Sequence, residues 1–415
     1  MRKKVRRGGG LGLLCATTLA VALALAACGS SSSSGGSGSS ASGNGSSSNA
    51  SGSPLLFGNV SEISGAAGTP EERNSVQAYF DQINASGGVD GHKLELTSCD
   101  DQSSPSVAAN CLKSLSSNSK VLAIVGNSDE TTESQYDMAD IGTAMTTAEN
   151  LTATNVFALA GDSESGSDAA ADIKYAEQKG LKKPGIIDCP TPSGCVSTFQ
   201  NIQKLVESQG MKLASASAPL TAVDMTPQVL ALKNAGVNFI FMDEAPSGVI
   251  DAMKAAQAIG YHPYWTLLWS SFSSNVATQL PAGTANVLVP SAYNISSPAF
   301  SQYEATMNKY IGQGKWVLSA LGLTGWTGAQ MLVETLKAIH GPITRASILA
   351  AAHNLTFTSP LLPGPVDLSQ PGAVKGMPSV RNWMWYLNTI QNGKFVQING
   401  GNPVDSESVV KAAVG

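Results

Sequence analysis

The sequence lacks the short motifs that mark common catalytic sites. After residue 28 it contains no G-x-S-x-G, H-E-x-x-H or phosphate-loop pattern. Two of its four histidines fall in predicted helices, and none accompanies a convincing serine or aspartate partner: His92, His262, His340 and His353. A triad assembled only in space stays open. A secreted hydrolase is therefore the least favoured function, and no catalytic residue is assigned.

Positive charge is also scarce outside the first 27 residues. The chain has 25 Lys and Arg, and five of these precede residue 8, which leaves 20 against 30 Asp and Glu. The remainder carries a net charge of −10 by this count. An acidic surface argues against nucleic acid as a partner and against a basic face that lies on a membrane.

The N-terminus has the pattern of an export signal. Basic residues precede an apolar run from Leu11 to Ala27, which is short for a membrane span and rich in small residues. An uncleaved anchor is the alternative. Small residues directly before Cys28 resemble the bacterial lipoprotein cleavage signal. This predicts a signal peptide over residues 1–27, with lipidation of Cys28.

Residues 28–53 are rich in Gly, Ser, Ala and Asn and show no apolar periodicity. Such a segment cannot bury enough surface to order itself, so it is predicted to be a flexible tether. The folded part then starts near Pro54. With 42% hydrophobic residues in 415, the chain is long enough for two ordinary domains.

Cysteine is sparse in the folded part. Its four cysteines are Cys99, Cys111, Cys189 and Cys195. An even count in an exported protein favours disulfides, and the short spacings favour Cys99 with Cys111 and Cys189 with Cys195. Free thiols or a metal site are the alternatives. No C-x-x-C spacing occurs and the histidines are scattered, so no metal and no cofactor are expected.

Helix and strand patterns alternate along the folded part. Thr69-Pro70 with Glu72 predicts a capped helix start, and Gly87-Gly88 predicts its end with a positive φ. Short apolar runs, typical of buried parallel strands, recur at 121–125, 185–188, 237–242 and 264–269. Strands separated by single helices predict an α/β fold of two doubly wound parallel-sheet lobes.

Two acids, Asp100 and Asp101, follow a predicted strand directly. A helix with Val107, Cys111 and Leu112 begins soon afterwards. The acids are predicted to cap and solvate this junction rather than to catalyse.

Several segments resemble the type I periplasmic binding proteins of branched-chain amino-acid ABC importers. These are "INASGGVDGHKLELTSCDD" with "VLAIVG", and then "TPQVLALKNAGVNFIFM" and "AMKAAQAIGYHP". The resemblance runs from about Pro54 to Val396. It implies two lobes that close on a small solute, joined by three crossovers near 160–166, 290–294 and 368–372. The implied lobes are 54–165 with 293–370, and 166–292 with 371–415.

The resemblance also implies ligand-binding residues in the first lobe. The segment "AMTTAENL" matches the relatives' carboxylate-gripping loop and assigns that role to Thr147 with Thr146. The loop "GNSDETTE" places Glu130 near a serine of the relatives, beside Ser128 and Thr131. A carboxylate there would repel an anionic ligand group unless it were protonated or paired.

In the second lobe the sequence departs from its relatives, which hold the ligand's α-ammonium with tyrosines and a glutamate. Trp269 and Ser270 follow the last predicted strand instead of an acid, and Asp243 with Glu244 are placed to compensate. An amine-bearing or amide-like solute that contacts Trp269 is expected at least as much as a free branched-chain amino acid. For each of these residues, a purely structural role is the alternative.

The function that follows is capture of a small polar solute for an ABC importer. The expected partners are the permease and ATPase subunits, and the protein is expected to be a monomer held by its lipid at the outer face of the cytoplasmic membrane. A sensing lipoprotein of the same fold is the alternative. Such a sensor would usually be fused to a membrane span and an output domain, and the sequence shows neither.

Overall fold

The computed structural model describes residues 51–65, 68–127, 135–145, 147–160, 162–190 and 193–415. These residues belong to one unit of the chain, which begins at Ser47. The predicted signal peptide, Cys28 and most of the predicted tether lie outside the described residues. Among those described, no helix combines the length and hydrophobicity needed to cross a membrane.

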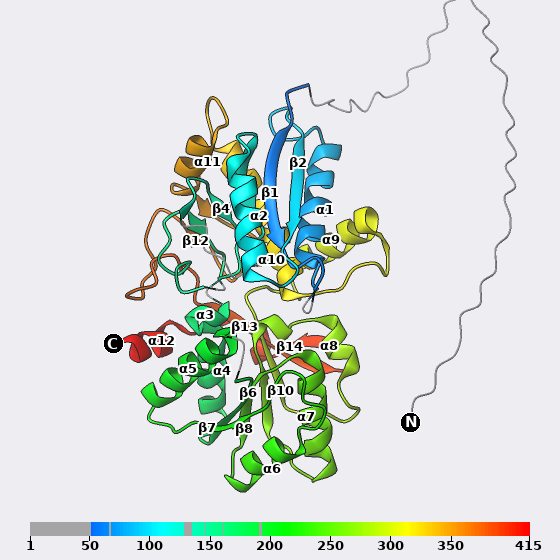
Figure 1. The fold of residues 1–415 in the computed structure, drawn as a ribbon, viewed down its shortest axis with the longest axis vertical. Helices are drawn as coiled ribbons and strands as arrows, with labels where there is room; N and C mark the ends of the chain where they lie inside the picture. The colour runs from blue at the N-terminus through cyan, green and yellow to red at the C-terminus, as the bar shows by residue number, and fades with distance from the viewer. Residues whose placement is uncertain (1–50, 66–67, 128–134, 146, 161, 191–192) are drawn as a thin grey trace, which may run out of the picture. The chain divides into compact units, whose positions relative to one another are not determined.

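The first sheet is formed by the N-terminal third of the chain (Figure 1). Its order is β2-β1-β3-β4-β5, and every pair is parallel. Helices alternate with the first strands, which gives the predicted crossovers. The elements are β1 (Leu55–Ser61), α1 (Glu71–Ala85), β2 (Leu94–Asp100), α2 (Pro105–Ser117), β3 (Val121–Val125), β4 (Asp140–Ile141) and β5 (Val156–Phe157).

The second sheet has the order β14-β13-β10-β9-β8-β6-β7. Its strands from β6 to β10 are parallel, so the prediction of two mainly parallel sheets is confirmed. The sequence did not predict the antiparallel strands that the C-terminal part adds. The strands are β6 (Pro184–Asp188), β7 (Ala214–Ser217), β8 (Phe239–Asp243), β9 (Tyr264–Leu267), β10 (Val287–Ser291), β13 (Met384–Gln391), β14 (Lys394–Gln397) and β15 (Val404–Asp405).

Helices connect the strands of the second sheet. Their apolar residues recur at helical spacing; in α5, for example, Ile202, Leu205 and Val206 are buried. The connecting elements are α3 (Asp162–Ser165), α4 (Ser167–Gln178), α5 (Ser193–Ser208), α6 (Thr226–Asn234), α7 (Pro246–Ala258), a 3₁₀ turn (Trp269–Ser271) and α8 (Ser274–Gln279).

After β10 the chain returns to the first sheet. Helix α10 packs along α1 and against β3 and β4. This segment contributes α9 (Pro298–Met307), a π-helical turn (Asn308–Gly312), α10 (Ala320–Lys337), α11 (Arg345–Ala352) and the antiparallel pair β11 (Thr356–Phe357) and β12 (Val366–Asp367).

The sequence predicted the end of helix α1 correctly and the residue that caps its start wrongly. At its C-terminus Gly88 has φ +77°, as predicted, and a Cβ there would lie 2.0 Å from the carbonyl oxygen of His92. Only glycine fits this turn. The predicted threonine cap is wrong. The helix starts after Pro70, and the buried Thr69 hydroxyl has no hydrogen-bond partner among the described residues.

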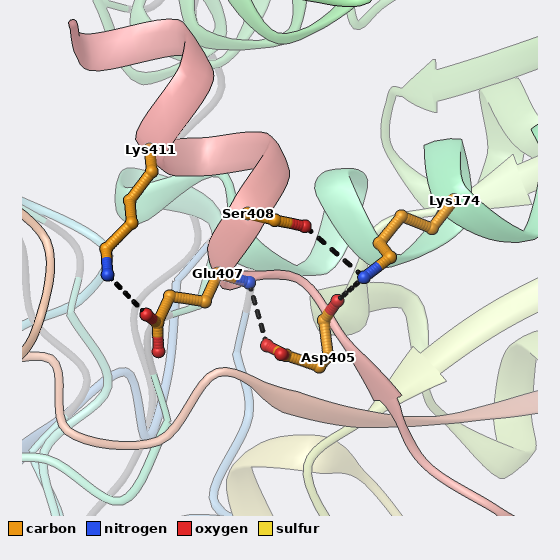
Figure 2. A network of polar contacts seen from close by, with 5 residues as sticks. All are labelled: Lys174, Asp405, Glu407, Ser408 and Lys411. Carbon is orange, nitrogen blue, oxygen red and sulfur yellow. Dashed lines mark hydrogen bonds and ion pairs between the residues drawn. The ribbon is translucent and has the colours of Figure 1, made fainter.

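The C-terminal helix α12 (Glu407–Val414) is fixed to α4 by a lysine (Figure 2). The Lys174 ammonium donates to the Asp405 carbonyl at 2.6 Å and to the Ser408 hydroxyl at 3.3 Å. The Asp405 carboxylate accepts the backbone N–H of Glu407 at 2.9 Å, which satisfies a free donor at the helix start. Buried Val409 and Val410 complete the contact.

Candidate functional site

Asp100 and Asp101 serve the backbone around the end of β2. The Asp100 carboxylate accepts the backbone N–H groups of Ser64 and Gln102, at 3.0 and 3.1 Å, and the Ser64 hydroxyl at 2.6 Å. This hydrogen bond from Ser64 holds the pKa of Asp100 below its usual value. Asp101 accepts the Ser103 N–H at 2.7 Å. The pair therefore caps the loops around this junction, as predicted, but Asp101 is buried and does not solvate it.

Two disulfides occur, in the same pairs that the spacing favours: Cys99 with Cys111, and Cys189 with Cys195. The first fastens α2 to β2 beside the junction just described. The second closes the loop after β6. A carboxylate oxygen of Asp243 lies within 4.8 Å of both sulfur atoms of this second disulfide. Because the sulfurs are bonded to each other, they are not available as thiolate ligands for a metal.

The first sheet's carboxyl edge is held by amide side chains. Asn59, at the end of β1, donates to the carbonyls of Val125 (3.1 Å) and Gly126. The Asn127 side-chain amide donates to the buried Asp140 carboxylate at 3.2 Å. The backbone carbonyl of Asn127 accepts the Ala144 N–H at 2.9 Å. These hydrogen bonds fix the loops after β3 and β4 relative to each other.

Helix α10 approaches the loop after β4 through glycine. A Cβ on Gly142, which has φ +76°, would lie 2.1 Å from Gly328 Cα, and a Cβ on Gly328 would lie 2.9 Å from Gly142 Cα. The two backbones are therefore in direct contact. This contact brings Thr324, one turn earlier on α10, to the same region as the residues that follow Gly142.

A small central cavity lies where the chain passes between the two sheets. Its volume is about 10 Å³, the room that one water molecule occupies. The connecting segments contribute part of its wall, from the stretches after β5 and β10: Leu159, Ala160, Ala292 and Tyr293. The rest comes from the loop after β4, from α10, from the 3₁₀ turn after β9 and from β13: Thr143, Ala144, Thr324, Trp269 and Trp385.

The wall of the central cavity is mainly apolar but includes polar groups. Tyr293 and Thr324 bond to each other through their hydroxyls at 2.9 Å. Thr143 and Trp385 are only 3% and 1% exposed. Their side-chain hydroxyl and indole N–H have no hydrogen-bond partner among the described residues. Such groups are costly to bury unless something satisfies them.

The second sheet's carboxyl edge carries acids. Asp188 ends β6 and Asp243 ends β8, and the two are paired neighbours in the parallel ladder. Glu244 follows directly. Asp168, in the first turn of α4, accepts the backbone N–H of Trp269 at 3.2 Å. We call these four residues, Asp168, Asp188, Asp243 and Glu244, the acid cluster.

Burial and repulsion raise the pKa values of two acids of the cluster, Asp243 and Glu244. Burial first, and then the charges of Glu244, Asp188 and Asp168, raise the pKa of Asp243 to about 8. Burial, followed by the charge of Asp188, raises the pKa of Glu244 to about 7. One turn along α4, burial and then the Asp168 charge raise the pKa of Asp172, with the Thr266 hydroxyl acting in the opposite direction. The edge therefore holds protons near neutral pH.

The structure places the predicted site residues unevenly. Asp243 and Glu244 lie together in the acid cluster, and the buried Trp269 lines the central cavity. Thr147 is outside the cavity wall, and its hydroxyl and carbonyl accept the Asn150 N–H at 3.4 and 3.1 Å. Ser128, Glu130, Thr131 and Thr146 lie outside the described residues.

Sequence reasoning missed several residues of this region: Thr143, Thr324, Trp385, Asp168 and Asp188. Asp188 had a usable signal, because it ends an apolar strand run as Asp243 does. Trp385 and Thr324 had no such signal. They lie on β13 and α10, far along the chain, and only the tertiary fold brings them to the cavity.

A family model described as "Periplasmic binding protein" matches residues 55–380. No curated protein matches the chain.

Solved structures with the same fold include a fatty acid ABC transporter substrate-binding protein from Thermomonospora curvata, at 18% identity and a TM-score of 0.73; the match covers 86% of this chain and 94% of that one. A branched chain amino acid ABC transporter from Thermus thermophilus with bound valine matches at 14% identity and a TM-score of 0.73. This match covers 87% of this chain and 99% of that one. A solute binding protein from Rhodopseudomonas palustris BisB5, in complex with 3,4-dihydroxy benzoic acid, matches at 16% identity and a TM-score of 0.67. This match covers 85% of this chain and 98% of that one.

Proposed function

We propose, because the chain belongs to the periplasmic binding protein family, that it captures a small polar solute outside the cytoplasm and delivers it to an ABC importer. Members of this family are receptors and not enzymes. The solute is proposed to be amino-acid-like, an amide or an amine. The related structures include a fatty acid ABC transporter binding protein, a protein with bound valine and a complex with an aromatic acid, so the solute class has to be inferred from this chain's own residues.

One observation carries the proposal. The central cavity is lined by residues of both sheets and of the segments that connect them. At about 10 Å³ it cannot hold a solute without rearrangement. We therefore propose that the lobes, 54–165 with 293–370 and 166–292 with 371–415, separate and close around the ligand, so that binding energy stabilises the closed state.

The proposal includes a lipid on Cys28 that holds the protein at the outer face of the cytoplasmic membrane. The N-terminal 27 residues and the Gly- and Ser-rich segment that follows Cys28 support this placement. The proposed partners are the permease and ATPase subunits of the importer. Proposed ligand contacts are Thr147, Asp243, Glu244 and Trp269, together with Ser128, Glu130, Thr131 and Thr146.

A thermal-shift library of amino acids, amides, polyamines and aromatic acids tests the function. At least one compound is expected to raise the melting temperature in proportion to the logarithm of its concentration, as mass action requires. Thr147→Ala and Glu244→Ala are each expected to reduce this shift. Thr152→Ala, an exposed threonine of the same loop, is the matched control and should retain it.

Two results would contradict the proposal. If no compound of the library stabilises the protein, solute capture is unsupported. If both substitutions retain the full shift, the assigned contacts are wrong even though the function stands.

A further inference from the structure

The acid cluster brings four carboxyl groups together at one edge of the second sheet. Adjacent parallel strands lie about 4.8 Å apart, so Asp188 and Asp243 meet at close range. The groups that repel Asp243 are all carboxylates: Glu244, Asp188 and Asp168. The ion pairs seen among the described residues do not include Asp188, Asp243 or Glu244; they are Lys254–Asp251, Lys337–Glu334 and Lys411–Glu407.

The acid cluster is continuous with the wall of the central cavity. Asp168 accepts the backbone N–H of Trp269 at 3.2 Å, and Trp269 lines the cavity. The Asp168 carboxylate is therefore anchored to the main chain of a residue that lines the cavity.

The cavity supplies a second and independent observation. The Trp385 indole N–H can only donate, and it is buried in a residue that lines the cavity, with no partner among the described residues. The Thr143 hydroxyl is buried in the same wall and also has no hydrogen-bond partner among the described residues. Together they call for a hydrogen-bond acceptor. Neither is charged, so an uncharged acceptor such as an amide carbonyl or a hydroxyl suits them better than a carboxylate, which needs charge compensation when it is desolvated.

We propose that the solute is a small organic cation, with a primary amine or guanidinium bound by the acid cluster and an uncharged acceptor oxygen bound by Trp385 and Thr143. The inference rests on the proposed function and narrows it from polar solutes in general to cations without a free carboxylate. A bound cation would stabilise the ionised form of these carboxyl groups, so they would release their protons and pair with the amine. A carboxylate on the same molecule would be repelled by the ionised acids, and the described residues of the cavity wall include no base to balance it.

A divalent metal ion fits the region less well. The Asp188 carboxylate already accepts the Ser217 hydroxyl through both oxygens, at 2.9 and 3.1 Å. The sulfurs near Asp243 form a disulfide. The remaining carboxyl groups are those of Asp168 on α4 and of Asp243 and Glu244 at the end of β8, whereas calcium takes 6 to 8 oxygen ligands.

Matched compounds test separately whether the protein selects the amine and whether it selects an uncharged acceptor. Valine, valinamide and isovaleramide share one carbon skeleton. Valinamide has the amine and the amide, valine has a carboxylate in place of the amide, and isovaleramide has no amine. The same comparison is made with arginine and argininamide, for a longer skeleton. Titration calorimetry on the purified full-length protein is expected to show each amino amide binding about tenfold or more tightly than its acid, and valinamide more tightly than isovaleramide by a similar factor.

Paired variants assign the effect to these residues. Asp243→Asn is expected to remove most of the preference for valinamide over isovaleramide, whereas Asp251→Asn, an acid on α7 that pairs with Lys254, keeps it. Trp385→Phe is expected to weaken amide binding about tenfold. Trp383→Phe is the control, because Trp383 is also buried, its N–H is likewise without a partner among the described residues, and it does not line the cavity.

The outcomes are distinct. Tighter binding of the acids, or of aromatic or fatty acids from the library, would overturn the cation inference and leave solute capture standing. Binding of calcium or magnesium alone that Asp243→Asn abolishes would make the cluster a metal site and overturn it as well. If nothing in the library or the matched series binds, the proposed function fails with it.

Discussion

The carboxyl edges of the two sheets face similar tasks with different chemistry. The first edge is ordered by amide side chains, since Asn59 and Asn127 donate to a carbonyl of β3 and to the Asp140 carboxylate. The second edge carries the acid cluster, and Asp243 and Glu244 have buried carboxyl oxygens without hydrogen-bond partners among the described residues. Hydrogen bonds therefore order the first edge, whereas the second edge gathers groups with raised pKa values. Changes to the first should cost stability, and changes to the second should alter ligand preference and pH response.

The largest effect is expected from the contact between α10 and the first edge. Gly328→Val would place side-chain atoms against the Gly142 backbone, where even a Cβ lies 2.9 Å from Cα. We expect the free energy of unfolding to fall by about 3 kcal/mol and ligand affinity to fall with it. Gly364→Val is the control, because Gly364 is exposed and has open space around it. Equal urea midpoints for the two variants would show that the close approach does not matter.

A smaller loss is expected from Asn59→Ala. The substitution leaves the Val125 and Gly126 carbonyls without their side-chain donor in a fully buried position. The expected decrease in unfolding free energy is about 2 kcal/mol. Asn354→Ala removes a comparable amide-to-carbonyl bond at an exposed position, 2.8 Å from Ala350, and should cost about 0.5 kcal/mol or less. Chemical denaturation of both variants measures the difference.

The smallest effect on stability, and the most pH-dependent, is expected at the second edge. The folded-state pKa of Asp243 is raised to about 8, so its protonated form favours folding. The stabilising contribution is complete below the unfolded value of about 4 and is lost as the pH rises through about 8. Asp243→Asn should therefore melt a few degrees above the natural protein at pH 8.5, and this advantage should vanish at pH 4. Melting curves across this range check it, with Asp251→Asn expected to give a flat difference.

The sequence predicted those parts of the fold that depend on local patterns. The apolar runs of β3, β6 and β8 and the turn at Gly88 were correct because periodicity and backbone sterics act within a few residues. The threonine cap failed because Pro70, and not Thr69, is the cap residue of a helix that starts at Glu71, and the Thr69 hydroxyl makes no hydrogen bond to it. Strands β4 and β5 are two residues each and are formed by pairing with neighbours, so they leave almost no local pattern.

The candidate site was predictable only in part, for the same reason. Asp243, Glu244 and Trp269 lie just after strands that the sequence shows plainly. The proximity of Asp188 depends on β6 lying beside β8, and the position of Trp385 depends on an antiparallel strand added near the C-terminus. Those placements arise from sheet order, which single-sequence periodicity does not encode.

The hydrogen bond between Asp168 and residue 269 uses the main-chain N–H of the tryptophan and leaves its indole uninvolved. Any amino acid other than proline at that position could supply the same donor. The ring that shapes the pocket can therefore be exchanged while the neighbouring charge stays anchored. Descendants of this protein with another side chain at position 269 could bind molecules of a different size and still select the same sign of charge.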